Sequence, residues 1–182
     1  MSFREGHYFS LDENKNYSEG ENFQDEIQIS NYTPADLAKL WRKTLERGIH
    51  GICFSMYEND QKPGDIIYGE QVNRRIQILK PYAKWVRSFS CIEGNEHIPR
   101  IAHQNGMKTL VGAWLGDDLE LNEREIEGLI TLAKEGCVDV AAVGNEVMYR
   151  KDLTEDQLID YIKRVKEALP NIPVGYVDAY YE

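Results

Sequence analysis

From about residue 33 onward, two patterns of hydrophobic residues alternate along the chain. Short, nearly continuous apolar runs predict buried β-strands, because a strand covered on both faces needs no alternation with polar residues. These runs lie at residues 51–57, 85–91, 109–114, 138–143 and 173–177. Between them, apolar residues recur three and four positions apart, which predicts helices with one face on a core. The alternation of strands and helices indicates an α/β fold with a parallel sheet covered by helices.

Capping residues mark where several of these helices begin. Thr33, followed by a proline, predicts the start of the first helix. Thr154 with Gln157 has the spacing of a capping box, and Asn122 with Glu125 has the same spacing at the start of an earlier helix. The first helix places four apolar residues on one face: Leu37, Leu40, Trp41 and Leu45.

The spacing of the predicted strands limits the architecture without deciding it. Their starts near residues 51, 85, 109, 138 and 173 are separated by 34, 24, 29 and 35 residues. Consecutive units of this length fit either a doubly wound sheet or a (β/α)₈ TIM barrel. A barrel needs eight strands, so a barrel built from this sequence would be incomplete, with about five parallel strands and their helices.

Charge is distributed unevenly along the chain. Residues 1–31 hold seven acidic and two basic side chains without a helical or alternating pattern, so we predict a loosely ordered acidic arm there and a partial barrel domain at 32–182. The whole chain has 21 Lys and Arg against 31 Asp and Glu, a net charge of −10. This balance argues against a nucleic-acid partner and against an anionic membrane surface. No apolar run approaches the roughly 18 residues of a membrane span, and the oligomeric state is left open.

The sequence contains no recognisable metal or cofactor motif. Neither the three cysteines nor the four histidines have the paired spacing of zinc ligands, and glycine-rich phosphate-binding motifs are absent. We therefore expect no metal and no cofactor. Cys53 and Cys91 lie in apolar runs, where a small buried thiol is expected. The start of the chain lacks the layout of a signal peptide, which favours a cytoplasmic location unless the sequence begins before residue 1.

Polar and aromatic residues follow each predicted strand. In both α/β architectures, sites form at the carboxyl ends of the strands. The residues at these positions are mainly acids, amides and aromatics, among them Tyr57, Glu58, Asn95, Trp114, Asp117, Asn145, Glu146, Asp178 and Tyr180. Aromatic faces stack on sugar rings, while carboxylates and amides bind hydroxyl groups. This composition indicates a carbohydrate site rather than a phosphate site.

The most specific signal is the segment at residues 143–147, Val-Gly-Asn-Glu-Val. A glutamate at the end of a barrel strand, after a glycine that lets the backbone turn, can point into the mouth of the barrel. Glycoside hydrolysis needs one carboxylic acid to protonate the leaving oxygen and a second carboxylate as nucleophile or base. The alternative is that Glu146 only occupies the first turn of a short helix, where an acid suits the helix dipole.

The segment resembles the strand-four signature of glycoside hydrolase family 17, which includes β-1,3-glucanases and glucan-modifying enzymes. Three further segments resemble the first three strands of that family, in the same order: residues 51–55 (Gly-Ile-Cys-Phe-Ser), 85–89 (Trp-Val-Arg-Ser-Phe) and 111–114 (Val-Gly-Ala-Trp). The resemblance covers about residues 48–182, the amino-terminal half of such an enzyme. It implies a (β/α)₈ barrel and a retaining mechanism on β-1,3-linked glucan.

The resemblance also implies roles for individual residues. Glu146 would be the general acid/base, Asn145 would hold the region of the sugar 2-hydroxyl, and Arg87 would lie beneath the carboxylates and keep them ionised or oriented. Four aromatic residues are candidate walls of the sugar subsites: Tyr57, Phe89, Trp114 and Tyr180. For Arg87 the alternative is a structural ion pair inside the barrel, and for the aromatics it is an ordinary place in the core or rim.

One element of the family pattern is missing. The nucleophile of the family is a glutamate in a Glu-x-Gly-Trp-Pro-like segment, and no such segment occurs in residues 1–182. Asp178 is the nearby strand-end acid, a candidate for substrate binding and a poor substitute for the nucleophile. We therefore expect a fragment without turnover of its own. Three alternatives remain: a β-glucan transglycosylase, a non-catalytic sugar-binding half-barrel, and an unrelated doubly wound protein.

Overall fold

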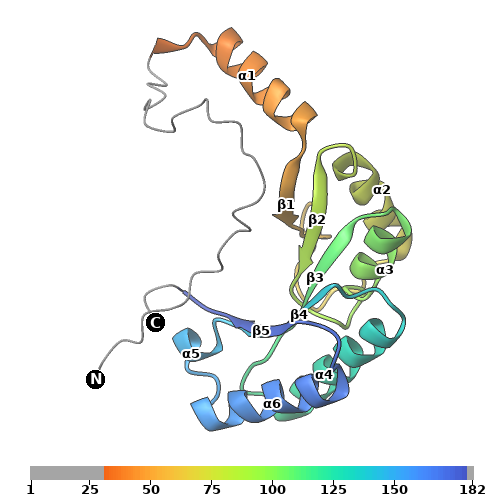
Figure 1. Ribbon diagram of the computed structural model, residues 1–182, viewed down its shortest axis with the longest axis vertical. Coiled ribbons are helices and arrows are strands. Elements are labelled where there is room, and N and C mark those ends of the chain that lie inside the picture. The colour runs from red at the N-terminus through yellow and green to blue at the C-terminus, as the bar shows by residue number, and fades with distance from the viewer. Residues whose placement is uncertain (1–30, 180–182) are drawn as a thin grey trace. The chain divides into compact units, whose positions relative to one another are not determined.

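The computed structural model describes residues 31–179 (Figure 1). Contacts divide the chain into two units, residues 1–40 and 41–182, and each is described by itself. Apart from Asn31, the predicted arm at 1–31 lies outside the described residues and stays a prediction. The elements in chain order are α1 (Pro34–Arg47), β1 (Ile49–Cys53), α2 (Gly69–Leu79), β2 (Ala83–Ser88), α3 (His97–Gln104), β3 (Lys108–Ala113), α4 (Leu119–Lys134), β4 (Val140–Asn145), α5 (Val147–Arg150), α6 (Glu155–Ala168) and β5 (Val174–Val177).

The order of the strands distinguishes between the two architectures that the sequence left open. Each strand pairs in parallel with the next one along the chain, so the sheet has the order β1-β2-β3-β4-β5. A doubly wound sheet reverses its order at a switch point, whereas right-handed crossovers in an unreversed order put all the helices on one face. Helices α2, α3, α4 and α6 indeed lie on the same side of the sheet (Figure 1). The α/β fold and its five parallel strands are therefore confirmed, in the arrangement of an incomplete barrel.

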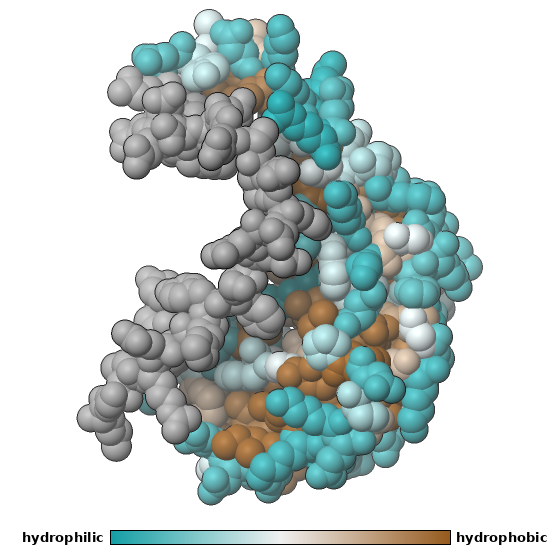
Figure 2. All heavy atoms as spheres, viewed as in Figure 1, coloured by the Kyte–Doolittle hydropathy of each residue, from teal (hydrophilic) through white to brown (hydrophobic). Residues whose placement is uncertain are grey.

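The core lies between the sheet and these helices in two clusters. The first joins β1 and β2 to α2 and α3 and includes Val86, Ile76 and Ile98, each at most 1% exposed. The second joins β3, β4 and β5 to α4 and α6 and includes Leu129 and Val143, both fully buried. Figure 2 shows hydrophobic residues gathered in this layer, with hydrophilic residues along the outer rim. Burial of this layer fixes each strand against its helix.

On β1 and β2, the opposite face of the sheet carries the side chains of His50, Trp85 and Arg87. Along β2, Val86 and Ser88 are buried on the helix side, while Trp85 and Arg87 are half-buried. Successive residues of a strand point to opposite faces, so Trp85 and Arg87 share the face away from the helices. Trp85 stacks on His50 of β1, with ring centroids 5.7 Å apart. His50 and Arg87 are thus placed on the face that would line a barrel.

Three local expectations were wrong. Helix α4 begins at Leu119 with Asp118 as its N-cap, so Asn122 lies one turn inside the helix and is fully buried. Cys91 is buried as expected, but Cys53 is exposed because β1 has a strand partner on one side only among the described residues. Helix α1 forms as predicted, yet it buries none of its residues in the described structure.

The capping box of α6, between Thr154 and Gln157, is confirmed. No helix within residues 31–179 is long and apolar enough to cross a membrane.

We expect Leu129→Ala to lower the free energy of unfolding by about 2–5 kcal/mol, because it leaves a cavity in a fully buried part of α4. Leu119→Ala, on the same helix at a position 51% exposed, is the matched control and should change it by less than about 0.5 kcal/mol. Equilibrium unfolding in urea, followed by circular dichroism, measures both. Equal effects of the two substitutions would contradict the placement of the second core cluster.

Candidate active site

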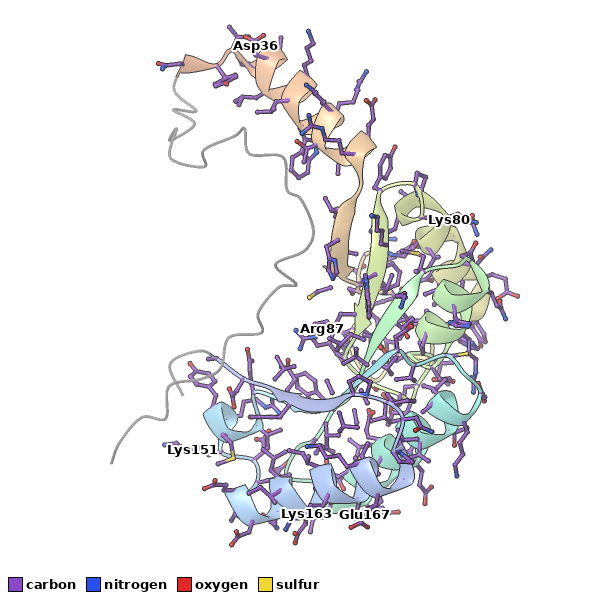
Figure 3. All side chains as sticks on the ribbon, in the orientation of Figure 1. Asp36, Lys80, Arg87, Lys151, Lys163 and Glu167 are labelled. Atoms are coloured by element: carbon purple, nitrogen blue, oxygen red, sulfur yellow. The ribbon has the colours of Figure 1, made fainter. Side chains whose placement is uncertain are left out.

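Arg87 and Asn145 come together at the carboxyl ends of β2 and β4. Arg87 projects from β2 on the face of the sheet away from α2 and α3 (Figure 3). Its Nη2 donates to Oδ1 of Asn145 at 2.6 Å, across the strand that separates β2 from β4. The guanidinium carbon lies 4.6 Å from the ring centroid of Phe89, within cation–π range. Three of the predicted site residues are therefore in one cluster.

Glu146 follows directly, with an unusual backbone. Its φ of 54° lies in the left-handed region, which is uncommon and costly for a residue with a side chain and is enriched at functional sites. The preceding Gly144 also has a positive φ, 86°, and a Cβ there would be 2.7 Å from Val147. The Glu146 side chain is exposed, and within residues 31–179 it makes no hydrogen bond or ion pair. It stands at the N-cap of α5 but makes no side-chain capping bond.

The end of β5 holds this backbone in place. The N–H of Glu146 donates to the carbonyl of Val177 at 2.8 Å. The hydroxyl of Tyr176 accepts from the N–H of Met148 at 3.0 Å and donates to the carboxylate of Asp178. Burial, together with the neighbouring carboxylate, raises the pKa of Tyr176 to about 12. Tyr176 therefore remains protonated and keeps both bonds over the physiological pH range.

Asp178 is engaged in the same contacts. Burial alone would raise its pKa, but hydrogen bonds from Tyr176 and from backbone N–H groups outweigh burial and hold the pKa below its usual value. Those backbone groups belong to Ala179, Tyr149 and Met148. The carboxylate is thus directed at the first turn of α5, immediately after Glu146. Substrate binding by Asp178 stays a prediction.

Arg150 follows β4 at the carboxyl end of the sheet, and the sequence analysis assigned it no role. Its Nη2 donates to the carbonyl of Leu115 at 2.7 Å, its Nη1 donates to the carbonyl of Asn145, and its Nε donates to Asp152 at 2.6 Å. Its guanidinium carbon also lies 4.4 Å from the ring centroid of Trp114, which is 38% exposed. Arg150 therefore ties the ends of β3 and β4 together and supports the Trp114 ring. Arg150 lies four residues after Glu146, and this spacing of about one helical turn was the signal in the sequence that could have placed the two residues close together.

Tyr57, a further aromatic candidate, lies apart from this cluster. Tyr57 packs against the core cluster of β1 and β2, and its hydroxyl accepts from Nδ2 of Asn95 at 3.5 Å. Its contacts thus run to the loop after β2 rather than to the Arg87–Asn145 pair. Tyr180 lies outside the described residues. The sugar-binding roles of both stay predictions.

Helix α4 contributes two buried polar residues that face the strand ends. Asn122 accepts from the N–H of Gly116 and donates to the carbonyl of the same residue, both at 2.8 Å. Glu125, 2% exposed, accepts from the Ser90 hydroxyl at 2.5 Å and from the N–H of Cys91 at 2.7 Å. Burial raises the pKa of Glu125 to about 7, although these hydrogen bonds oppose the rise. Sequence reasoning assigned both residues to a helix cap and so missed this role.

No group of three or more His, Cys, Asp or Glu residues within 31–179 is arranged to hold a metal ion. The chemistry that the described residues offer is that of carboxylates, an amide, a guanidinium and aromatic rings. Groups of these types can bind and protonate oxygen atoms of hydroxylated ligands.

The raised pKa of Glu125 makes stability depend on pH. Because the folded-state pKa, about 7, lies above the ordinary value of 4.5, the folded protein holds this proton more tightly than the unfolded chain does. The resulting stabilisation is complete below about pH 4.5 and is lost as the pH rises toward 7, by at most roughly 3 kcal/mol. We expect the unfolding free energy of the wild type to fall relative to that of Glu125→Gln, whose side chain does not titrate, as the pH rises over this range in urea titrations. A difference that does not vary with pH would contradict it.

Comparison with known proteins places these features in a family. Residues 51–182 match the family model described as the BtgE/BtgC glycoside hydrolase domain. A glucan 1,3-beta-glucosidase of Saccharomyces cerevisiae is 30% identical over 101 residues, covering 53% of this chain and 32% of the relative. One of Schizosaccharomyces pombe is 24% identical over 157 residues, covering 80% of this chain and 48% of the relative.

A solved structure gives the same result at the level of the fold. The glycoside hydrolase family 17 beta-1,3-glucanosyltransferase of Rhizomucor miehei matches with a TM-score of 0.64 and 26% identity, over 75% of this chain and 52% of that chain. The chain thus spans between about a third and about a half of the length of these relatives. Because the family model covers more than half of its residues, the chain belongs to the BtgE/BtgC glycoside hydrolase domain family and has a domain like that of glycoside hydrolase family 17.

Proposed function

We propose that this chain supplies the general acid/base and part of the sugar-binding surface of a glycoside hydrolase acting on β-1,3-linked glucan. The proposal rests chiefly on the exposed Glu146 carboxylate beside the Arg87–Asn145 hydrogen bond. The matched relatives are named glucan 1,3-beta-glucosidases, and the solved one is a beta-1,3-glucanosyltransferase. Their names support the choice of a β-1,3-glucan as the substrate class.

The orientation of Asn145 follows from the chemistry of its partner. Arg87 can only donate hydrogen bonds, so the group that faces it must be the amide oxygen of Asn145. The Nδ2 amino group then points elsewhere and serves as a donor next to Glu146. A sugar hydroxyl can accept from such a donor, as the sequence analysis expected for the 2-hydroxyl. Arg87 in this proposal sets the orientation of the amide and supplies positive charge beneath the reacting centre.

In the proposed reaction, the Glu146 carboxylic acid donates its proton to the glycosidic oxygen as the bond to the sugar breaks. A second carboxylate about 5–5.5 Å away attacks the sugar carbon in a retaining enzyme, and Glu146 then takes the proton of the incoming acceptor. Residues 1–182 contain no Glu-x-Gly-Trp-Pro-like segment. We therefore assign the nucleophile to none of them. We propose that a sugar ring stacks on Trp114, whose exposed indole ring packs against the guanidinium of Arg150.

Transfer to a second sugar is the alternative to hydrolysis. Both reactions share the glycosyl-enzyme step and differ in the acceptor, which is water in one and a sugar hydroxyl in the other. The solved relative is a glucanosyltransferase, which favours transfer as the second candidate. Either reaction uses Glu146 in the same role.

Binding of laminaritriose to the chain tests the proposed surface. We expect measurable binding by calorimetry, weakened about tenfold by Asn145→Ala, because one hydrogen bond to a hydroxyl is lost. Glu146→Gln should alter the affinity less than about threefold, since the amide keeps the size of the side chain. Asn171→Ala, at an exposed position before β5, is the matched control. No binding, or equal effects of the two asparagine substitutions, would contradict the site.

Turnover tests the assignment of the nucleophile. We expect residues 1–182 alone to release no products from laminari-oligosaccharides, because retaining catalysis needs two carboxylates. Chromatography of the products after long incubation is the measurement. A rate that disappears in Glu146→Gln would show that a second carboxylate within these residues completes the reaction. In that case, products longer than the substrate would identify transfer and shorter products alone would identify hydrolysis.

A further inference from the structure

A buried carboxylate on α4 connects the ends of β2 and β3. Glu125 accepts from the hydroxyl of Ser90 at 2.5 Å and from the N–H of Cys91 at 2.7 Å, both just after β2. The backbone N–H of Trp114, just after β3, also lies within reach of the same carboxylate and lowers its pKa. Glu125 is only 2% exposed, so solvent cannot readily replace its carboxylate as the acceptor for these donors. One side chain thus fixes the backbone at two strand ends.

The loop after β2 depends on such contacts for its path. Glu93 has a φ of 56° and Gly94 a φ of 90°, so this loop departs from locally preferred backbone conformations. A Cβ at Gly94 would be 2.3 Å from the carbonyl oxygen of Ile67. On the other side, α4 comes so near that a Cβ at Gly128 would be 2.8 Å from the Cβ of Cys91. The loop is therefore held between two backbones, with Glu125 as its polar anchor.

The strand ends that Glu125 fixes carry the proposed sugar-contacting residues. Phe89 precedes Ser90 and lies against the guanidinium of Arg87. Trp114 has its own backbone N–H directed at Glu125, while its ring lies against Arg150. A shift of either backbone would change the spacing between these aromatic rings.

We propose that Glu125 is a positioning residue that sets the relative placement of Phe89 and Trp114, and through them the fit of a glucan chain. The part of this inference that concerns sugar rests on the proposed function. The ionised carboxylate, the main form above its pKa of about 7, suits the position because both of its oxygens accept hydrogen bonds from the converging donors. A glutamine would accept through one oxygen only and would direct its amino group at the remaining donors. This position therefore favours glutamate over glutamine, which has nearly the same size but accepts fewer hydrogen bonds.

The test uses the chain labelled with 5-fluorotryptophan and follows the fluorine resonance of Trp114, assigned with Trp114→Phe. We expect Glu125→Gln to shift or broaden this resonance and to leave those of Trp41 and Trp85 in place. Laminaritriose affinity, measured by calorimetry, should fall about tenfold, the equivalent of one lost hydrogen bond. Glu127→Gln, an exposed acid two positions along α4, is the matched control and should change neither quantity. Ser90→Ala removes one donor and should give a smaller shift of the same resonance.

The two measurements distinguish a failure of the proposed function from a failure of this inference. If the wild type binds no laminaritriose, the proposed function fails, while the Trp114 resonance still decides whether Glu125 controls the strand ends. If Glu125→Gln leaves both the resonance and the affinity unchanged, the inference is overturned. If Glu125→Gln does not fold, Ser90→Ala and Glu125→Asp decide the matter through the same resonance. Unchanged spectra in both of those variants would overturn the inference as well.

Discussion

The polar backbone groups at the carboxyl ends of the strands must find hydrogen-bond partners, because the sheet no longer supplies them beyond its last paired residues. In this chain, polar side chains from the following helices supply them. Gln71 of α2 donates to the carbonyl of Met56, Asn122 of α4 binds both backbone groups of Gly116, and Arg150 of α5 bonds the carbonyls of Leu115 and Asn145. The edge of the sheet that carries the proposed site is therefore fixed by buried polar contacts as much as by the apolar core.

The exposed carboxylate of Glu146 depends on this arrangement. Its left-handed backbone costs free energy, and bonds from Tyr176, Val177 and Asp178 to the start of α5 compensate for that cost. Asp178 is the strand-end acid that sequence reasoning considered for substrate binding. Its observed contacts give it a local task in holding the turn that presents Glu146. The exposed carboxylate of Glu146 and the hydrogen-bonded carboxylate of Asp178 are thus two parts of one local structure.

The strands and most helices could be predicted from the sequence, because runs of apolar residues and capping residues act locally. The choice between barrel and doubly wound sheet could not, since strand order depends on which strands pair in space. The family resemblance placed Arg87 and Asn145 in the same site, but it did not predict the hydrogen bond between them. Asn122 and Glu125 were misassigned because their spacing of three fits a capping box. Yet both also fall on the apolar stripe with Ile126 and Leu129, and a polar residue on such a stripe is a signal for a buried role.

This arrangement separates the residues that would touch a glucan from those that hold them in place. The former, among them Asn145 and Glu146, lie at strand ends. Several of the latter come from the following helices, as Asn122, Glu125 and Arg150 do. A buried carboxylate such as Glu125 has a high desolvation cost, which an apolar residue of similar volume would avoid. An apolar residue would, however, leave the Ser90, Cys91 and Trp114 donors without an acceptor. The charge is therefore best explained by the geometry of the strand ends, and its cost in stability is the consequence of placing two loops with one side chain.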